Sequence, residues 1–245
     1  MTFLSIKKCL GVNLDHIATI RELRHTPYPD LLDAARIAQD AGADSITLHL
    51  RQDRRHIQEK DVYLVRKNLS LPLNLEMAVT ERMIDFALSV KPTYCCLLAE
   101  QANERTTNGG LNLEAISDGI KKTILQLTRA GIKTTIFIDP DPRQIELAKE
   151  VGAFGVELCT QAYAEAMEEK TVKQELKRIK RVAEQAALLG LQVNAGHALH
   201  YENVGAIIAI PQISELNIGH AIIARAVLVG LSQAVREMAD LIHKN

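Results

Sequence analysis

The chain has 245 residues, of which 47% are hydrophobic and 24% are charged, and its formal net charge is −1. This length and apolar content are enough for one large core. The near-neutral charge argues against nucleic acid or an anionic membrane as the main partner, because both select a strongly basic face. The four cysteines contain no CxxC pair, which favours reduced thiols in a cytosolic compartment.

The N-terminal stretch does not resemble a signal peptide, because its apolar run is short and its charges stand in the wrong order. No later run approaches the roughly 18 apolar residues of a membrane span. We therefore expect a soluble, cytoplasmic protein without a membrane partner.

Short β-rich runs alternate with helical patterns along the whole chain. The expected strands cover residues 10–15, 45–50, 71–77, 94–99, 133–138, 154–159, 191–196 and 215–220. Between the first two, Leu31, Ala34, Ala38 and Ala41 repeat at helical spacing and predict one buried helix face. Residues 171–190 predict a longer amphipathic helix of the same kind.

Glycines mark the ends of four of these helices, at Gly42, Gly131, Gly152 and Gly190. A glycine just past a helix end supplies the left-handed cap conformation at little steric cost. The recurrence indicates one strand–helix unit used repeatedly, without a linker between units.

Eight strands that alternate with helices predict the α/β class, as a (β/α)8 TIM barrel with additional helices, formed by residues 1–245 as a single domain. An open doubly wound sheet is less favoured, because no GxGxxG follows the first strand. Residues 1–9 and 100–112 would be additions outside the strand–helix units of the barrel. Residues 100–112 would form a mobile lid or an ordinary surface loop.

The C-terminal ends of barrel strands share one rim, where active sites are found. All eight expected strand ends are polar. They carry Asn13, Asp15 and His16; His49 and Arg51; Glu76; Glu100; Asp139; Glu157; Asn194 and His197; and Asn217 and His220.

Histidines and glutamates gathered in one concave site can act as acids and bases near neutral pH. Glu76 follows an apolar strand, so burial would raise its pKa toward that of a useful base, unless an arginine pairs with it. For Glu100 and Asp139 we expect the simpler roles of helix capping or exposure to solvent.

Arginines after the first two strands indicate anionic substrates, since a guanidinium matches two phosphate oxygens. Arg21 and Arg24 follow the first strand, and Arg51 and Arg55 follow the second. A solvated surface patch is the alternative for Arg55. The helix start after Gly219 offers backbone N–H groups to a second phosphate.

The strand ends carry no lysine, which disfavours a Schiff-base aldolase. The sequence also has no HxH or HExxH pair, so we predict no metal site.

Six motifs occur together in order: GVNLDHIATIR, LHLRQDRRHI, NLEMAVT, TTNGGL, VNAGH and ELNIGHAIIARAV. With them the chain resembles the pyridoxine 5′-phosphate synthase family from about residue 10 to residue 240. The resemblance implies a (β/α)8 barrel with added helices, assembled as a homo-octamer built from dimers. It implies condensation of 1-deoxy-D-xylulose 5-phosphate with 3-amino-2-oxopropyl phosphate, without redox cofactor or metal, to pyridoxine 5′-phosphate, phosphate and water.

The resemblance also implies residue roles. By motif match, His49 and Glu76 are the proton acceptors, His197 is the proton donor, and Glu157 stabilises a cationic transition state. The set for the amino-ketone phosphate is Asn13, Arg24, Gly219 and His220, and the set for deoxyxylulose phosphate is Asp15, His16, Arg51, His56 and Thr106. Ala198 is a further substrate-binding position. Ala198 stands where the family usually has glycine, and alanine disfavours positive φ.

Two other functions remain open from the residues themselves. A phosphosugar isomerase or epimerase barrel would need only one phosphate-binding site and fewer arginines. A non-catalytic binder of phosphorylated ligands would tolerate the loss of His49 and Glu76 without losing its ligand.

Overall fold

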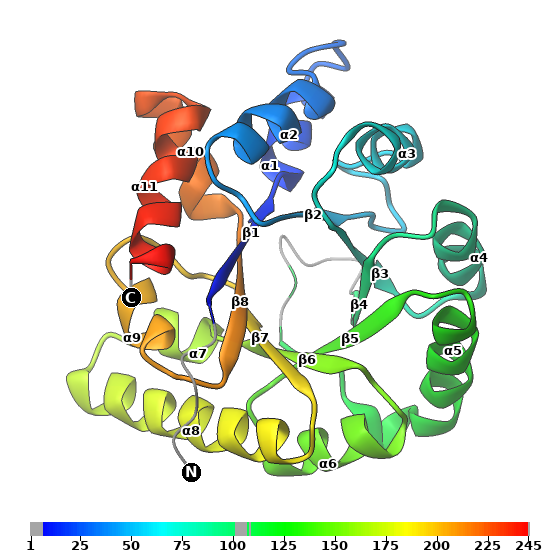
Figure 1. The fold of residues 1–245 in the computed structure, drawn as a ribbon, viewed down its shortest axis with the longest axis vertical. Helices are drawn as coiled ribbons and strands as arrows, with labels where there is room; N and C mark the ends of the chain where they lie inside the picture. The colour runs from blue at the N-terminus through cyan, green and yellow to red at the C-terminus, as the bar shows by residue number, and fades with distance from the viewer. Residues whose placement is uncertain (1–6, 101–106, 108, 245) are drawn as a thin grey trace.

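The computed structural model describes residues 7–100, 107 and 109–244. Eight parallel strands close a barrel in chain order, and β8 pairs with β1 (Figure 1). The strands are β1 (Cys9–Asn13), β2 (Ser45–His49), β3 (Leu73–Ala78), β4 (Tyr94–Leu98), β5 (Lys133–Ile138), β6 (Gly155–Cys159), β7 (Gln192–Gly196) and β8 (Ile213–Ile218). The predicted (β/α)8 TIM barrel is confirmed, with its strands in the expected order.

Strand boundaries differ from the prediction mainly where a helix begins early. The first strand ends at Asn13, so Asp15 and His16 lie in the first turn of a helix. The eighth strand runs two residues earlier than expected, because His220 already belongs to the following helix. Both shifts place backbone N–H groups of a helix start directly at the rim.

Helices surround the barrel, and several are additional to one per strand (Figure 1). They are α1 (Asp15–Glu22), α2 (Leu31–Asp40), α3 (Glu59–Asn68), α4 (Glu81–Val90), α5 (Ser117–Arg129), α6 (Pro142–Glu150), α7 (Gln161–Ala164), α8 (Glu169–Leu188), α9 (Val204–Ile208), α10 (His220–Val229) and α11 (Leu231–His243), with a 3-10 turn η1 (Leu113–Ala115). Two helices each follow β1, β6 and β8. Among the described residues, no helix is both long enough and apolar enough to cross a bilayer.

The glycine caps behave as predicted. Gly42, Gly131, Gly152 and Gly190 all have positive φ, between 75° and 109°. The predicted face of α2 is also buried, and Asp30 caps this helix by accepting a hydrogen bond from the Asp33 N–H.

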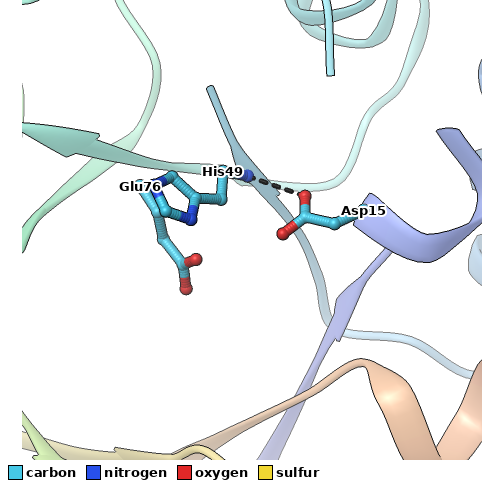
Figure 2. Close-up of side chains that lie close together, drawn as sticks. All are labelled: Asp15, His49 and Glu76. Carbon is cyan, nitrogen blue, oxygen red and sulfur yellow. Dashed lines mark hydrogen bonds between the residues drawn. The ribbon is translucent and has the colours of Figure 1, made fainter. Parts of the chain in front are cut away.

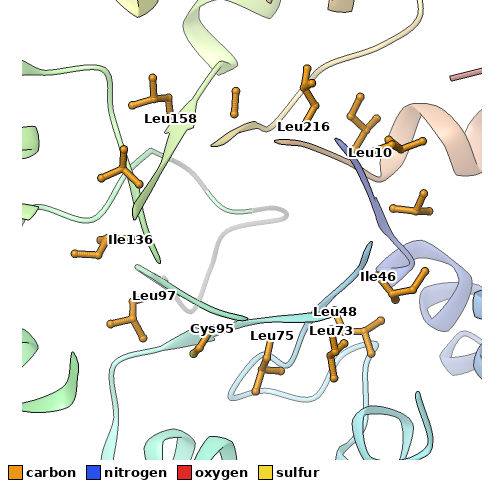
Figure 3. Close-up of a cluster of buried hydrophobic side chains, with 14 of the residues drawn as sticks. Leu10, Ile46, Leu48, Leu73, Leu75, Cys95, Leu97, Ile136, Leu158 and Leu216 are labelled. Carbon is orange, nitrogen blue, oxygen red and sulfur yellow. The ribbon is translucent and has the colours of Figure 1, made fainter. Parts of the chain in front are cut away.

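The main hydrophobic core lies between the barrel and its helices. Figure 3 shows the aliphatic side chains of successive strands pointing away from the barrel axis, among them Leu10, Leu48 and Leu75. Because side chains alternate along a strand, the intervening residues face the interior. In most barrels of this fold bulky branched residues fill that interior.

Here the interior is largely polar. Hydrogen bonds cross it from Ser45 Oγ to Glu215 Oε1 (3.1 Å) and from Thr47 Oγ1 to Asn217 Oδ1 (2.9 Å). The buried polar residues on the strands are Ser45, Thr47, His49, Asn74, Thr134, Thr135, Glu157, Asn194, Glu215 and Asn217. The polar rim predicted from the sequence therefore continues down into the barrel.

Candidate active site

Three titratable side chains meet where β1, β2 and β3 end. Asp15 Oδ1 accepts a hydrogen bond of 2.9 Å from the backbone N–H of His49, and His49 lies beside Glu76 in the β2–β3 register. Figure 2 shows the carboxyl groups of Asp15 and Glu76 on the same side of the His49 ring. One ligand atom from each residue lies within 4.8 Å of the others.

Asn13 and Asp15 hold each other in place at the start of α1. Asn13 Nδ2 donates to Asp15 Oδ2, and the Asp15 N–H donates to Asn13 Oδ1, both at 2.9 Å. Gly219 packs against Asn13 so closely that a Cβ there would stand 3.0 Å from Asn13 Cβ. The starts of α1 and α10 are thus adjacent.

His16 and His220 join these two helix starts. Their Nδ1 atoms are 3.3 Å apart, and the rings meet edge to face with centroids 5.0 Å apart. Burial lowers the pKa of His16, Asp15 opposes this shift, and the neighbouring His220 adds to it.

The turn after β2 folds back toward His49. Arg51 is only 3% exposed and pairs with Asp53, at 3.3 Å between Nε and Oδ1. The His56 ring lies 6.0 Å from the His49 ring, and burial lowers the pKa of His56 while nearby Asp15 opposes that shift. Arg51 and His56 are therefore brought to the same end of the barrel as His49.

The two arginines after β1 lie in different environments, because Arg21 is buried and Arg24 is exposed. Arg21 is buried and makes a bidentate ion pair with Asp61, at 2.6 and 2.8 Å. Since its guanidinium already pairs with the Asp61 carboxylate, Arg21 has a structural role and is not placed to bind an anionic substrate.

Arg24 is exposed beyond the far end of α1. It lies two residues past Glu22, the last residue of this helix. In the part of the chain that the structure describes, its guanidinium has no ion-pair partner. Among the described residues, no hydrogen bond links the Arg24 side chain to another predicted site residue, and its place in the site stays a prediction.

Glu76 and Glu157 form a pair of carboxyls with raised pKa. Burial raises the pKa of Glu157 to about 8, and the hydrogen bond of 2.7 Å that Asn217 Nδ2 donates to Oε2 opposes this shift. Burial likewise raises the pKa of Glu76, and the charges of Glu157 and Asp15 raise it further. At neutral pH Glu157 therefore holds its proton, and the surroundings of Glu76 likewise disfavour its charged form.

Glu100 does not cap a helix or face solvent as expected. Its side chain is 4% exposed, and its Oε1 lies 3.0 Å from His49 Nε2. The sequence placed it on the rim but offered no sign of this partner, because β2 and β4 are separated by β3. Asp139, in contrast, is exposed and accepts a hydrogen bond from the Gly110 N–H, which agrees with a structural role.

His197 and Ala198 follow β7 in an uncommon backbone conformation, with φ values of 80° and 60°. The His197 ring lies 6.2 Å from the Phe137 ring, and Thr160 Oγ1 donates a hydrogen bond of 2.5 Å to the His197 carbonyl. The conformation disfavoured by alanine is thus the one that Ala198 adopts. Thr106 lies outside the described residues.

Active sites of (β/α)8 barrels lie at the rim where these groups meet, and this arrangement places the protein among the barrel enzymes. The sequence model of the family described as "Pyridoxal phosphate biosynthesis protein PdxJ" matches residues 10–244. The chain belongs to this family.

Curated relatives support the same assignment. The chain is 53% identical to the "Pyridoxine 5′-phosphate synthase" of Idiomarina loihiensis, over 96% of this chain and 97% of that protein. Proteins of the same name from Coxiella burnetii and Pseudoalteromonas translucida are each 52% identical, over 95% of this chain and 97% and 96% of theirs.

Two solved structures share the fold. One is a 4-hydroxy-2-oxoglutarate aldolase/2-deydro-3-deoxyphosphogluconate aldolase from TTHB1, with a TM-score of 0.63, 15% identity, and coverage of 98% of this chain and 96% of that one. The other is a phosphoribosylanthranilate isomerase from Thermotoga maritima, with a TM-score of 0.59, 11% identity, and coverage of 97% and 100%. At such identity the likeness shows the barrel and nothing more.

Proposed function

We propose that the chain is a ring-closing synthase, which condenses 1-deoxy-D-xylulose 5-phosphate with 3-amino-2-oxopropyl phosphate to pyridoxine 5′-phosphate, phosphate and water. Its membership of the PdxJ family and its identity above half with curated synthases support this reaction. The structural observation that carries the proposal is the meeting of His49, Glu76 and Asp15 at the rim.

His49 and Glu76 act as proton acceptors in this proposal, and His197 acts as the proton donor. The amine of one substrate attacks the ketone of the other to give an imine, so the enzyme needs no lysine of its own. Proton removals at different carbons and the loss of water then require more than one base. The raised pKa of Glu76 supports its role, because a carboxylate with a higher pKa binds a substrate proton more strongly.

Glu157 stabilises positive charge that develops on the condensing substrates. Its carboxyl lies deep in the barrel, where charge interactions are stronger than in water. A developing cation above it favours release of its proton, and the hydrogen bond from Asn217 supports the resulting carboxylate.

Two phosphate sites flank these groups. Asn13, Gly219 and His220, together with Ala198, would hold the amino-ketone phosphate at the start of α10, where backbone N–H groups are free for an anion. Arg24 belongs to this set only through the family resemblance.

Asp15, His16, Arg51 and His56, with Thr106, would hold deoxyxylulose phosphate and its departing phosphate. Arg51 supplies a fixed positive charge beside the base, and this charge would neutralise the leaving group.

The proposal extends to assembly and location. We infer a single domain over residues 1–245, a cytoplasmic enzyme, and a homo-octamer built from dimers. Exposed apolar side chains on α10 and just past the end of α1 support self-association, since Leu23, Val227 and Leu228 are 77%, 73% and 80% exposed.

The test mixes the purified protein with both substrates and follows pyridoxine 5′-phosphate and released phosphate together, beside a His49→Asn variant. We expect both products to appear in equal amounts with the wild type and neither with the variant. Consumption of deoxyxylulose phosphate alone would favour an isomerase. Binding of both substrates without turnover would leave a non-catalytic binder and would overturn the proposal.

A further inference from the structure

We propose that Glu100 is the positioning residue for His49, and that it makes this histidine a base by fixing its proton on Nε2. This inference rests on the proposed role of His49 as a proton acceptor, and it goes beyond the residues assigned above.

The contact is short and buried. Glu100 follows β4 and reaches across the end of β3 to His49, with 3.0 Å between Oε1 and Nε2. The two side chains are 4% and 6% exposed. Both side chains are thus largely shielded from water, and the ends of two strands of the barrel hold the geometry of the contact.

The second oxygen of Glu100 is also engaged. Oε2 accepts a hydrogen bond of 3.0 Å from the backbone N–H of Gln52, and Gln52 Nε2 lies 3.4 Å from the same oxygen. Gln52 is the residue after Arg51, so Glu100 ties the base to the turn that carries the proposed phosphate-binding arginine.

These contacts define the tautomer of His49. Burial alone would raise the pKa of Glu100, but the hydrogen bonds from His49 and Gln52 outweigh it and lower the pKa, so that Glu100 is a carboxylate. A carboxylate only accepts hydrogen bonds, and a neutral imidazole carries one N–H. The proton of neutral His49 therefore resides on Nε2, and Nδ1 keeps its lone pair.

The free lone pair faces the reaction site. Figure 2 shows one ring nitrogen of His49 directed between the carboxyl groups of Asp15 and Glu76. With Nε2 bonded to Glu100, Nδ1 is the atom that can take a proton from a substrate. The carboxylate also stabilises the imidazolium that this step produces.

An amide cannot replace this carboxylate, which makes Glu100→Gln a sharp test. If the amide oxygen faces Nε2, its NH₂ group meets the Gln52 N–H, donor against donor. If the NH₂ group faces Nε2, His49 must accept there and carry its proton on Nδ1, where it is no longer a base. We expect kcat to fall about 10²-fold, with KM for both substrates nearly unchanged.

The matched control is Glu215→Gln. Glu215 is also buried in the barrel and accepts a hydrogen bond from Ser45 Oγ, but it lies near the N-terminal end of β8, away from the rim. We expect this variant to keep wild-type turnover. Glu100→Asp, which retains the charge, should recover part of the activity that Glu100→Gln loses.

Two readouts separate positioning from a merely structural role. ¹⁵N NMR of the His49 ring should show Nε2 protonated in the wild type and a shift toward protonated Nδ1 in Glu100→Gln. The acidic limb of kcat/KM should also move to lower pH, because the imidazolium loses its carboxylate. The other charged groups facing His49 remain in both proteins: Asp15 on α1, Glu76 on β3, and Arg51 and His56 in the turn after β2.

A double variant distinguishes the possible failures. If Glu100 acts through His49, adding Glu100→Gln should not lower any residual turnover of His49→Asn further. Full activity of Glu100→Gln, or an unchanged tautomer, would overturn this inference alone. Full activity of His49→Asn would instead overturn the proposed function on which it rests.

Discussion

Gly196 leaves the space that the carboxyl of Glu157 occupies. A Cβ at position 196 would stand 2.3 Å from Glu157 Oε1, closer than any real contact allows. The two residues lie on the neighbouring strands β6 and β7, and Asn217 on β8 holds the other carboxyl oxygen. Three successive strands thus fix one buried carboxyl, and the smallest residue is part of that arrangement.

Gly196→Ala should therefore displace Glu157. We expect turnover to fall at least tenfold, since a misplacement near 1 Å costs about 10²-fold, and stability to fall by about 1–3 kcal/mol from overpacking. Steady-state kinetics and urea unfolding would measure both effects. Gly205→Ala in α9 is the control, because nothing lies within 4 Å of the Cβ it would add. Equal activity of the two variants would show that the position of Glu157 is not critical.

Glu157 should make the protein less stable as pH rises. Its pKa is about 8 in the folded protein, against an ordinary 4.5, so between these values the folded state binds more protons than the unfolded state. Its contribution to stability is complete below pH 4.5 and is lost as pH rises through 8.

Glu157→Gln should remove that part of the pH dependence. The free energy of unfolding, measured in urea from pH 5 to pH 9, should decline by a few kcal/mol less in the variant than in the wild type. Glu215, with a pKa of about 7, contributes in the same direction in both proteins. Parallel curves for the two proteins would contradict the raised pKa of Glu157.

Local sequence signals were sufficient to predict much of this fold. The glycine caps, the apolar face of α2 and the eight β-rich runs each depend on residues within a few positions of one another. The rim could be predicted as well, because the ends of parallel strands must lie together.

Long-range partners could not be predicted in this way. Arginine is a residue type that often binds phosphate, so Arg21 looked like a ligand. Its partner Asp61 is 40 residues away, and only the packing of α1 near α3 reveals it. Glutamate after a strand often caps the next helix, but the partner of Glu100 is His49, which lies two strands away in the barrel. In both cases the residue type was ambiguous, and tertiary contact decided its role.

The group of Asp15, His49 and Glu76 could geometrically share a metal ion. The proposed reaction needs proton transfer from these residues rather than a Lewis acid. We therefore expect turnover to be unchanged after dialysis against a chelator, measured with both substrates. Loss of activity that added divalent metal restores would show that a metal acts in the reaction.

The Arg21–Asp61 pair should matter for stability but not for chemistry. Asp61→Asn leaves a buried guanidinium without its counter-charge, which typically costs about 3–5 kcal/mol. Urea unfolding should show this loss, while kcat at low temperature should stay near wild type. Asp33→Asn is the control, because its ion pair with Arg36 is exposed and should contribute under about 1 kcal/mol. A selective loss of substrate affinity in Asp61→Asn would return Arg21 to the binding site.

Ala198→Gly should stabilise the loop after β7. At φ of 60° an L-residue is disfavoured by about 1–2 kcal/mol. Glycine removes this strain but loses about 0.4–1 kcal/mol of stability, because its unfolded chain has more conformational entropy. The net gain in unfolding free energy should thus be about 1 kcal/mol or less, and KM for 3-amino-2-oxopropyl phosphate should not rise. Ala224→Gly in exposed α10 should instead destabilise by about 1 kcal/mol. An equal loss of stability in both variants would contradict this prediction. It would show that the surroundings of Ala198 favour alanine at this positive φ.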